Sequence, residues 1–231
     1  MLGLPEGVTA CLFDLDGVLT QTAVVHANAW KQMFDDYLRE QGRQRPFDAH
    51  DDYDTYVDGK PRDAGVRDFL ASRGIHVDDA EVKRLGDIKN DLVIELIKRD
   101  GVEAYEGSVR YLNAARDAGL RRAVVSSSHN CQDVLRSAGI EDLLEERVDG
   151  NVTDELGLNG KPAPDTFLEG AKRLGVEPSQ AAVFEDALAG VEAGRAGDFG
   201  HVIGVNRVGQ RDALKQHGAD VVVDDLAELL P

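Results

Sequence analysis

Short apolar segments alternate with amphipathic stretches along most of this chain, and this alternation constrains the possible folds more than any other feature. The segments have the length of β-strands, and apolar residues recur with helical spacing in the stretches between the later ones. Strands that alternate with helices indicate a parallel sheet covered on both faces, so we predict the α/β class. The predicted strands are residues 10–13, 122–126, 181–184, 201–205 and 220–223, and the predicted helices are residues 108–118, 130–138, 164–174 and 189–194.

One long stretch interrupts the alternation. It contains no convincing strand, although helical patterns cover residues 23–41, 62–72 and 78–99. About 80 helical residues inserted after the first strand of a parallel sheet indicate a second domain, joined to the core by two connections. We therefore predict a core made of residues 1–21 and 105–231 and a helical domain, residues 22–104, that opens and closes by hinge motion.

The composition excludes two classes of partner. The formal net charge is −17, from 43 acidic and 26 basic residues, and it repels the phosphates of nucleic acids and anionic membranes. Cys11 and Cys131 do not make a disulfide framework. We see no signal peptide and no apolar run of membrane-spanning length, so we expect a monomeric cytoplasmic protein. The polar stretch at residues 43–58 is predicted to be an acidic, mobile loop.

Two carboxylates directly follow the first predicted strand. Asp14 and Asp16 lie two positions apart, and because residues i and i+2 share a face of a strand, both acids leave its end on the same side. This spacing suits a nucleophilic carboxylate beside a carboxylate that acts as acid and base. It is equally compatible with a solvated turn, so the pair alone leaves both interpretations open.

Further polar motifs follow other predicted strands, at the sheet edge where open α/β folds bind ligands. The run from Ser126 to Asn130 enters a helix and suits either an anion site or an ordinary helix cap. Lys161 lies on a proline-stiffened loop, where many lysines are simply solvated. Glu185 and Asp186 end another strand, and four carboxylates at two strand ends repel unless a cation lies among them. Oxygen ligands favour a hard ion such as Mg²⁺.

The order and spacing of these motifs resemble the haloacid dehalogenase superfamily of phosphotransferases over almost the whole chain. The resemblance implies a Rossmann-like core with an α-helical cap inserted after the first strand. It implies that Asp14 attacks the phosphoryl group to form an aspartyl-phosphate and that Asp16 is the acid/base. It further implies phosphate ligands at Ser126, Ser127 and Lys161, and Mg²⁺ bound by Asp14, the backbone carbonyl of Asp16 and Asp186, with Glu185 close by.

The helical insert resembles that of the β-phosphoglucomutase-like subfamily. The resemblance implies that a small phosphorylated sugar, β-D-glucose 1-phosphate, is converted to glucose 6-phosphate through the 1,6-bisphosphate. Gly59 and Arg62 match a turn that binds the distal phosphate in this subfamily. The other residues that the resemblance implies at the substrate are Thr22, His26, Trp30, Lys89 and Asn90, together with Ser128 and Asn130 of the serine loop. Taken without the resemblance, His26 and Trp30 fit interdomain packing, and Arg62 and Lys89 fit solvated positions.

Three positions depart from the subfamily pattern. Asp58 and His129 stand where the mutases have lysines, and Ala187 replaces a small hydroxyl residue. A sugar-phosphate or other phosphomonoester phosphatase on the same scaffold is therefore the nearest alternative. A receiver-type phosphoacceptor signalling module is a remote one, because such a module needs a shorter chain and no helical insert.

Overall fold

Parallel strands build the centre of the fold. The computed structural model describes residues 2–42 and 45–231, and within them six strands form one sheet in the order β3-β2-β1-β4-β5-β6. The structure confirms the predicted α/β class and all five predicted strands, within a residue or two at each end. The strands are β1 (Ala10–Phe13), β2 (Arg121–Val125), β3 (Glu146–Val148), β4 (Ala181–Glu185), β5 (His201–Val205) and β6 (Val221–Val223).

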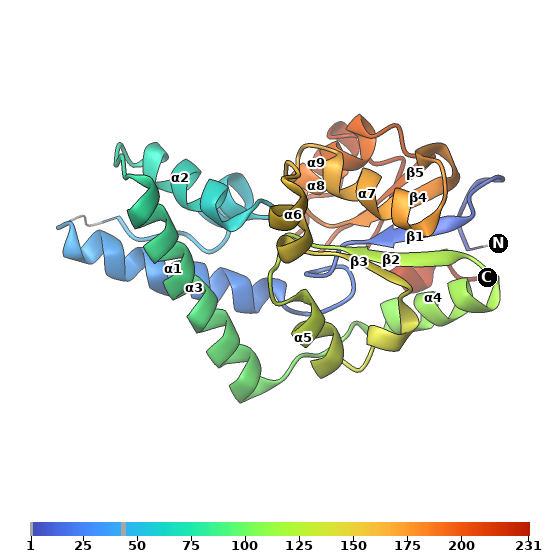
Figure 1. Cartoon of the computed structure of the whole chain (residues 1–231), viewed down its shortest axis with the longest axis horizontal. Coiled ribbons are helices and arrows are strands. Elements are labelled where there is room, and N and C mark those ends of the chain that lie inside the picture. The colour runs from blue at the N-terminus through green and yellow to red at the C-terminus, as the bar shows by residue number, and fades with distance from the viewer. Residues whose placement is uncertain (1, 43–44) are drawn as a thin grey trace.

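Helices cover both faces of this sheet (Figure 1). On one face, Cys11 and Phe13 of β1 pack with α4 and α5, and on the other Ala10 and Leu12 pack with α7 and α8. All four residues of β1 are fully buried, as expected for a central parallel strand. The core helices are α4 (Glu106–Asp117), α5 (Cys131–Ser137), α6 (Gly150–Leu156), α7 (Asp165–Leu174), α8 (Leu188–Ala196) and α9 (Arg211–Gln216), with 3-10 turns η2 (Glu141–Leu143), η3 (Pro178–Gln180) and η4 (Leu226–Leu229).

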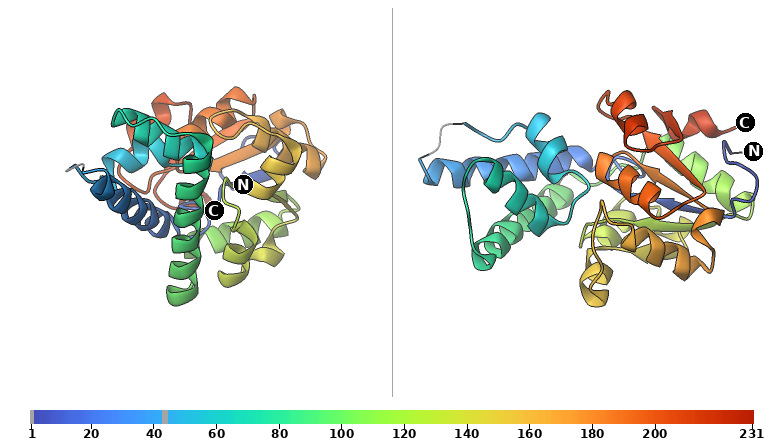
Figure 2. Two further views of the ribbon diagram at one scale, coloured as in Figure 1. Left: turned by 60° about the vertical axis from the view of Figure 1, so that its left-hand side comes forward. Right: turned by 90° about the horizontal axis from the view of Figure 1, so that it is seen from above.

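The inserted segment forms a helical unit beside the carboxyl edge of the sheet, clearly separate from the core in Figures 1 and 2. Its elements are α1 (Ala23–Glu40), the π-helical turn η1 (Tyr53–Val57), α2 (Arg62–Ser72) and α3 (Asp79–Asp100). The three helical patterns predicted here are thus confirmed. Aromatic rings hold them together: the ring centroid of Phe34 lies 4.2 Å from that of Phe69 and 5.2 Å from that of Phe47.

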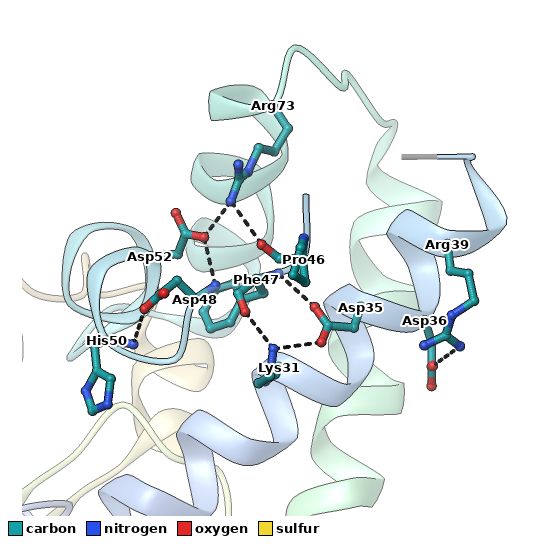
Figure 3. Close-up of polar contacts among 10 residues, drawn as sticks. All are labelled: Lys31, Asp35, Asp36, Arg39, Pro46, Phe47, Asp48, His50, Asp52 and Arg73. Atoms are coloured by element: carbon teal, nitrogen blue, oxygen red, sulfur yellow. Dashed lines mark hydrogen bonds and ion pairs between the residues drawn. The ribbon is translucent and has the colours of Figure 1, made fainter. Parts of the chain in front are cut away.

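The predicted loop at residues 43–58 is more ordered than its composition suggests. Residues 43 and 44 lie outside the described part of the chain, but from residue 45 onward side chains of the helices bind the segment (Figure 3). Lys31 donates to the Phe47 carbonyl at 2.8 Å, Asp35 accepts from the Phe47 amide at 2.7 Å, and Arg73 pairs with Asp52 at 2.5 Å. The acidic residues therefore serve here as partners of specific donors, and the segment includes the unpredicted turn η1.

The two connections between core and insert run side by side. Thr20 and Ala104 form an antiparallel bridge, the Gln21 amide donates to the Glu103 carbonyl at 2.9 Å, and the Tyr105 amide donates to the Leu19 carbonyl at 3.0 Å. The two connections therefore join the insert to the core at one place. In the described part of the chain, no helix combines the length and apolar character that crossing a bilayer requires.

Candidate active site

The carboxyl ends of β1, β2 and β4 bring the first group of predicted site residues together. In the sheet register Phe13 pairs with both Val124 and Phe184, so Asp14 emerges between β2 and β4. Ser126 follows β2, Glu185 ends β4 and Asp186 follows it. Parallel pairing alone thus places residues more than 100 positions apart at one edge.

Three of these carboxylates form a cluster that can bind a metal ion. Asp14, Glu185 and Asp186 are buried, and each offers an oxygen within 4.8 Å of the others. Burial above all, and then neighbouring carboxylates, raises the pKa of Asp186 well above the usual carboxyl value. A bound cation would relieve this repulsion, and a set of oxygen donors suits a hard divalent ion. The residues present therefore fit a metal site.

Gly17 allows the turn after Asp16 to lie against this cluster. Its φ is +84°, and a side chain at this position would collide with the Asp186 carboxylate. Glycine meets both requirements at no steric cost. The Gly17 turn and the Asp186 turn are therefore in direct contact, and the position of one limits the position of the other.

Lys161 lies behind the carboxylates. Its Nζ is 2.5 Å from Asp14 Oδ1 and 2.6 Å from Glu185 Oε1, and it also donates to the Val125 carbonyl at 3.1 Å. Burial by itself lowers the pKa of this ammonium, but the two carboxylates outweigh it and raise that pKa above its ordinary value. The two carboxylates therefore stabilise the charged form of the buried Lys161 next to Asp14.

Asp16 belongs to a second network that reaches into the insert. Thr22 donates to Asp16 Oδ1, His26 Nε2 lies 3.3 Å from the same oxygen, and His26 Nδ1 lies 2.7 Å from Lys89 Nζ. Burial alone would raise the pKa of Asp16, but His26 and the Thr22 hydrogen bond outweigh it and lower that pKa to about 2. Asp14 and Asp16 thus occupy opposite electrostatic environments, because burial raises the pKa of Asp14. Such a difference separates the roles of paired carboxylates.

Lys89 is stabilised poorly as a cation. Burial lowers its pKa from 10.5 to about 7, and the pull of Asp16 in the other direction does not compensate. Because the folded state binds this proton more weakly than the unfolded state, the charge of Lys89 costs stability below the folded pKa. The cost falls as pH rises from about 7 towards 10.5.

Lys89→Met is therefore expected to raise the free energy of unfolding by about 1 kcal/mol or more near neutral pH. The gain should shrink as pH rises towards 10. Denaturant unfolding at several pH values measures it, with Lys83→Met, an exposed lysine of the same helix, as the control. A Lys89→Met protein less stable than the wild type at neutral pH would show that the lysine contributes to stability.

The insert is closed over the core edge. The Ser127 hydroxyl donates to the Gly59 carbonyl at 3.0 Å, and Asn130 Nδ2 donates to Asn90 Oδ1 at 2.9 Å. Gly160 of the core lies so close to Pro61 that a side chain there would collide with the proline ring. Ser127, predicted as a phosphate ligand, therefore uses its hydroxyl as a contact to the insert in this closed form.

A cavity of about 70 Å³ lies between insert and core. Typical ligand pockets measure about 300–1,000 Å³, so this cavity is smaller than a usual small-molecule site. Most predicted site residues line the cavity, whereas Thr22, Lys161 and Glu185 do not. Lys161 pairs with both Asp14 and Glu185, and Thr22 contacts Asp16. The predicted residues in the lining are Asp14, Asp16, His26, Trp30, Gly59, Arg62, Lys89, Asn90, Ser126, Ser127, Ser128, Asn130 and Asp186.

Two of the lining residues also serve packing. Trp30 is 4% exposed, its ring lies 5.1 Å from that of Phe34, and Lys89 Nζ lies 4.9 Å above it. Trp30 therefore packs inside the insert, rather than between the domains, and it also lines the cavity. Arg62 lies at the start of α2, and its buried Nε has no hydrogen-bond partner among the described residues. A buried N–H without a partner fits an anion that binds in the cavity.

Four residues of the insert that line the cavity were not among the predicted site residues: Tyr53, Val57, Asp58 and Lys60. Tyr53 and Asp58 are the two whose contacts bear on the chemistry. They hydrogen bond with each other, and burial, followed by the charge of Glu185, raises the pKa of Asp58 to about 7. Lys60 does not offset this acid, because it pairs with Asp68 at 2.7 Å. The neighbouring Gly59 turn was the available signal for Asp58, whereas nothing in the sequence marked Tyr53.

Comparison with known proteins identifies the class to which this fold and this site belong. The sequence model of the haloacid dehalogenase-like hydrolases matches residues 8–198, and the chain belongs to this family. It is an enzyme of phosphoryl transfer or hydrolysis.

Relatives of two activities resemble the chain over nearly its whole length. A β-phosphoglucomutase of Mycobacterium bovis is 54% identical, over all of this chain and 94% of the relative. Hexitol phosphatase A of Escherichia coli is 32% identical over 94% of this chain and 91% of its own. The crystal structure of β-phosphoglucomutase from Clostridium difficile superposes with a TM-score of 0.80 at 28% identity, over 96% of this chain and 93% of that one.

Proposed function

We propose that this enzyme is a β-phosphoglucomutase that converts β-D-glucose 1-phosphate to glucose 6-phosphate through the 1,6-bisphosphate. A mutase must hold two phosphates of one sugar, and the cavity offers one position beside the proposed nucleophile and a second beside a cationic side chain. Asp14 with Lys161 and the carboxylate cluster lies on the core side, and Arg62 with its unpartnered buried Nε lies on the insert side. This second cationic position is the observation that carries the proposal.

The proposed reaction assigns separate tasks to the residues of the core. An oxygen of Asp14 attacks phosphorus as the P–O bond to the sugar breaks, and Asp16 supplies the proton that the leaving oxygen needs. Starting from the 1,6-bisphosphate, this first step at C1 releases glucose 6-phosphate. In the return step Asp16 takes the proton of the C6 hydroxyl of β-D-glucose 1-phosphate as that oxygen attacks the aspartyl-phosphate, which regenerates the bisphosphate and frees Asp14. Lys161 neutralises Asp14 and the phosphoryl oxygens, so that two anions can meet.

Mg²⁺ is the proposed cofactor, held by Asp14, Asp186 and the backbone carbonyl of Asp16, with Glu185 beside it. When bound, it neutralises charge on the transferring phosphoryl group. Ser126 is the proposed additional phosphoryl ligand, together with Ser127 once the insert has opened. Thr22 and His26 hold Asp16 in its place, because both contact its Oδ1.

The insert, residues 22–104, is the proposed substrate cap. In the closed form its contacts with the core keep water from the aspartyl-phosphate, and this exclusion separates a mutase from a phosphatase. Gly59, Trp30, Lys89, Asn90, Ser128 and Asn130 also line the cavity and are the proposed sugar contacts.

A sugar-phosphate phosphatase is the second candidate, and Asp58 is the observation that favours it. A carboxylate in the cavity lowers the positive charge available for a second phosphate. To distinguish the two, the enzyme with Mg²⁺ is given β-D-glucose 1-phosphate and a trace of the 1,6-bisphosphate, and glucose 6-phosphate and free phosphate are followed together. Glucose 6-phosphate in large excess supports the mutase, whereas dominant free phosphate contradicts it.

Arg62→Met is expected to lower the mutase kcat/KM by about 100-fold, because a charge-assisted contact to the distal phosphate is lost. The ratio of free phosphate to glucose 6-phosphate should rise at the same time, since the bisphosphate leaves more readily. The same assay with Arg67→Met is the control, because Arg67 lies on the same helix and pairs with Asp79 at the surface. Equal losses of mutase activity in the two variants would contradict a distal-phosphate role for Arg62.

A further inference from the structure

The loop between β5 and α9, residues 206–210, contacts both turns of the carboxylate cluster, although none of its residues contributes a carboxylate to it. Arg207 Nε donates to the Gly17 carbonyl at 2.6 Å. Gln210 Nε2 donates to the Asp186 carbonyl at 3.0 Å. Two side chains of one loop, three positions apart, thus bind the backbone of the two turns that carry Asp16 and Asp186.

Arg207 is itself firmly held. Its side chain is 15% exposed, Nη1 donates to the Asp224 carbonyl at 2.9 Å, and its guanidinium lies 3.6 Å above the ring of Tyr105. Tyr105 follows the return connection from the cap, and its amide donates to Leu19. A planar guanidinium can lie flat on a ring while its N–H groups donate within its own plane, whereas an ammonium has no plane that could stack in this way. The chemistry of this position is therefore specific to arginine.

The two hydrogen bonds act on a contact that tolerates little displacement. The Gly17 backbone lies directly against the Asp186 carboxylate, so movement of either turn changes the spacing of the metal-binding oxygens. Partners beyond the ligands themselves commonly set metal affinity by orienting those ligands. We infer that Arg207 and Gln210 are positioning residues, which fix the Gly17 and Asp186 turns relative to each other and thereby set the affinity of the carboxylate cluster for a divalent cation.

This inference rests on the metal-dependent chemistry proposed above, but its main test does not require turnover. Mn²⁺ binding to the protein without sugar is measured by electron paramagnetic resonance for the wild type, Arg207→Met, Arg207→Lys and Gln210→Met. Arg207→Met is expected to weaken Mn²⁺ binding by about 10-fold, with partial recovery in Arg207→Lys. In turnover, kcat should fall by about 10-fold with a smaller change in KM for the sugar.

Arg122→Met is the matched control. Arg122 is buried, donates to the Leu143 carbonyl at 2.9 Å and lies 3.1 Å from Glu145, but it sits at the opposite edge of the sheet, near the amino end of β2. Its loss should lower the unfolding temperature without changing Mn²⁺ affinity. If Arg207→Met unfolds, Gln210→Met still tests the inference, because it removes a single bond to the Asp186 turn.

Wild-type Mn²⁺ affinity in both Arg207→Met and Gln210→Met would overturn the inference and leave these residues with a structural role alone. A wild-type enzyme that hydrolyses its substrate, while the two variants bind Mn²⁺ weakly, would overturn the proposed mutase and leave the positioning role in place. The two failures are therefore distinguishable.

Discussion

Asp14→Asn is expected to reduce turnover by roughly 10⁴-fold or more, while the protein remains folded. The asparagine keeps the size of the side chain but lacks the nucleophilic oxygen on which the aspartyl-phosphate forms. Folding should be unaffected or slightly favoured, because Asp14 is a buried carboxylate whose pKa is raised by burial. Lys161 keeps Glu185 as its partner at 2.6 Å.

Steady-state assays of glucose 6-phosphate and free phosphate, together with thermal unfolding, measure both parts of this expectation. Asp52→Asn is the matched control: Asp52 is as buried as Asp14 but pairs with Arg73 inside the cap (Figure 3). That variant should lose stability and keep turnover. An Asp14→Asn enzyme that retained a substantial part of wild-type turnover would exclude Asp14 as the nucleophile.

Lys161→Met is expected to damage both stability and activity. It leaves the carboxylates of Asp14 and Glu185 buried without their shared cation, and breaking a buried ion pair in this way costs about 3–5 kcal/mol. Turnover should fall by about 10³-fold, because phosphoryl charge is no longer neutralised beside the nucleophile. Added Mg²⁺ should restore part of the lost stability, since a cation in the cluster replaces some of the missing charge.

Denaturant unfolding with and without Mg²⁺ measures this effect, and Lys172→Met is the control, because Lys172 is exposed and pairs with Glu169. The control should change stability by less than about 0.5 kcal/mol. Equal stability of Lys161→Met and the wild type would mean that the two carboxylates do not need the lysine as a counter-ion.

The fold was predictable where the sequence pattern is local. β1 and β4 are short apolar runs that end in acids, and such runs mark buried parallel strands without knowledge of their neighbours. β3 has only three residues, two of them charged, and the seven residues of α6 and six of α9 are too few for a helical repeat to stand out. These short elements form because they pack against neighbouring strands and helices.

The core part of the candidate site was predictable for the same reason. Asp14, Lys161 and Asp186 each follow or precede a recognisable element, and parallel pairing brings strand ends together. Contacts across the cap were not predictable in this way. Lys89 and His26 meet across 63 positions, and Arg207 meets Gly17 across 190, through packing that no local pattern encodes.

The central claim is that Asp14 carries the phosphoryl group between two positions of one sugar. Its most direct test is mass spectrometry of the peptide that contains Asp14, after the enzyme and Mg²⁺ react with glucose 1,6-bisphosphate and are quenched in acid. The account predicts a phosphoryl group on Asp14 in the wild type and none in Asp14→Asn. A phosphoryl group on a different residue, or turnover without any phosphorylated peptide, would contradict it.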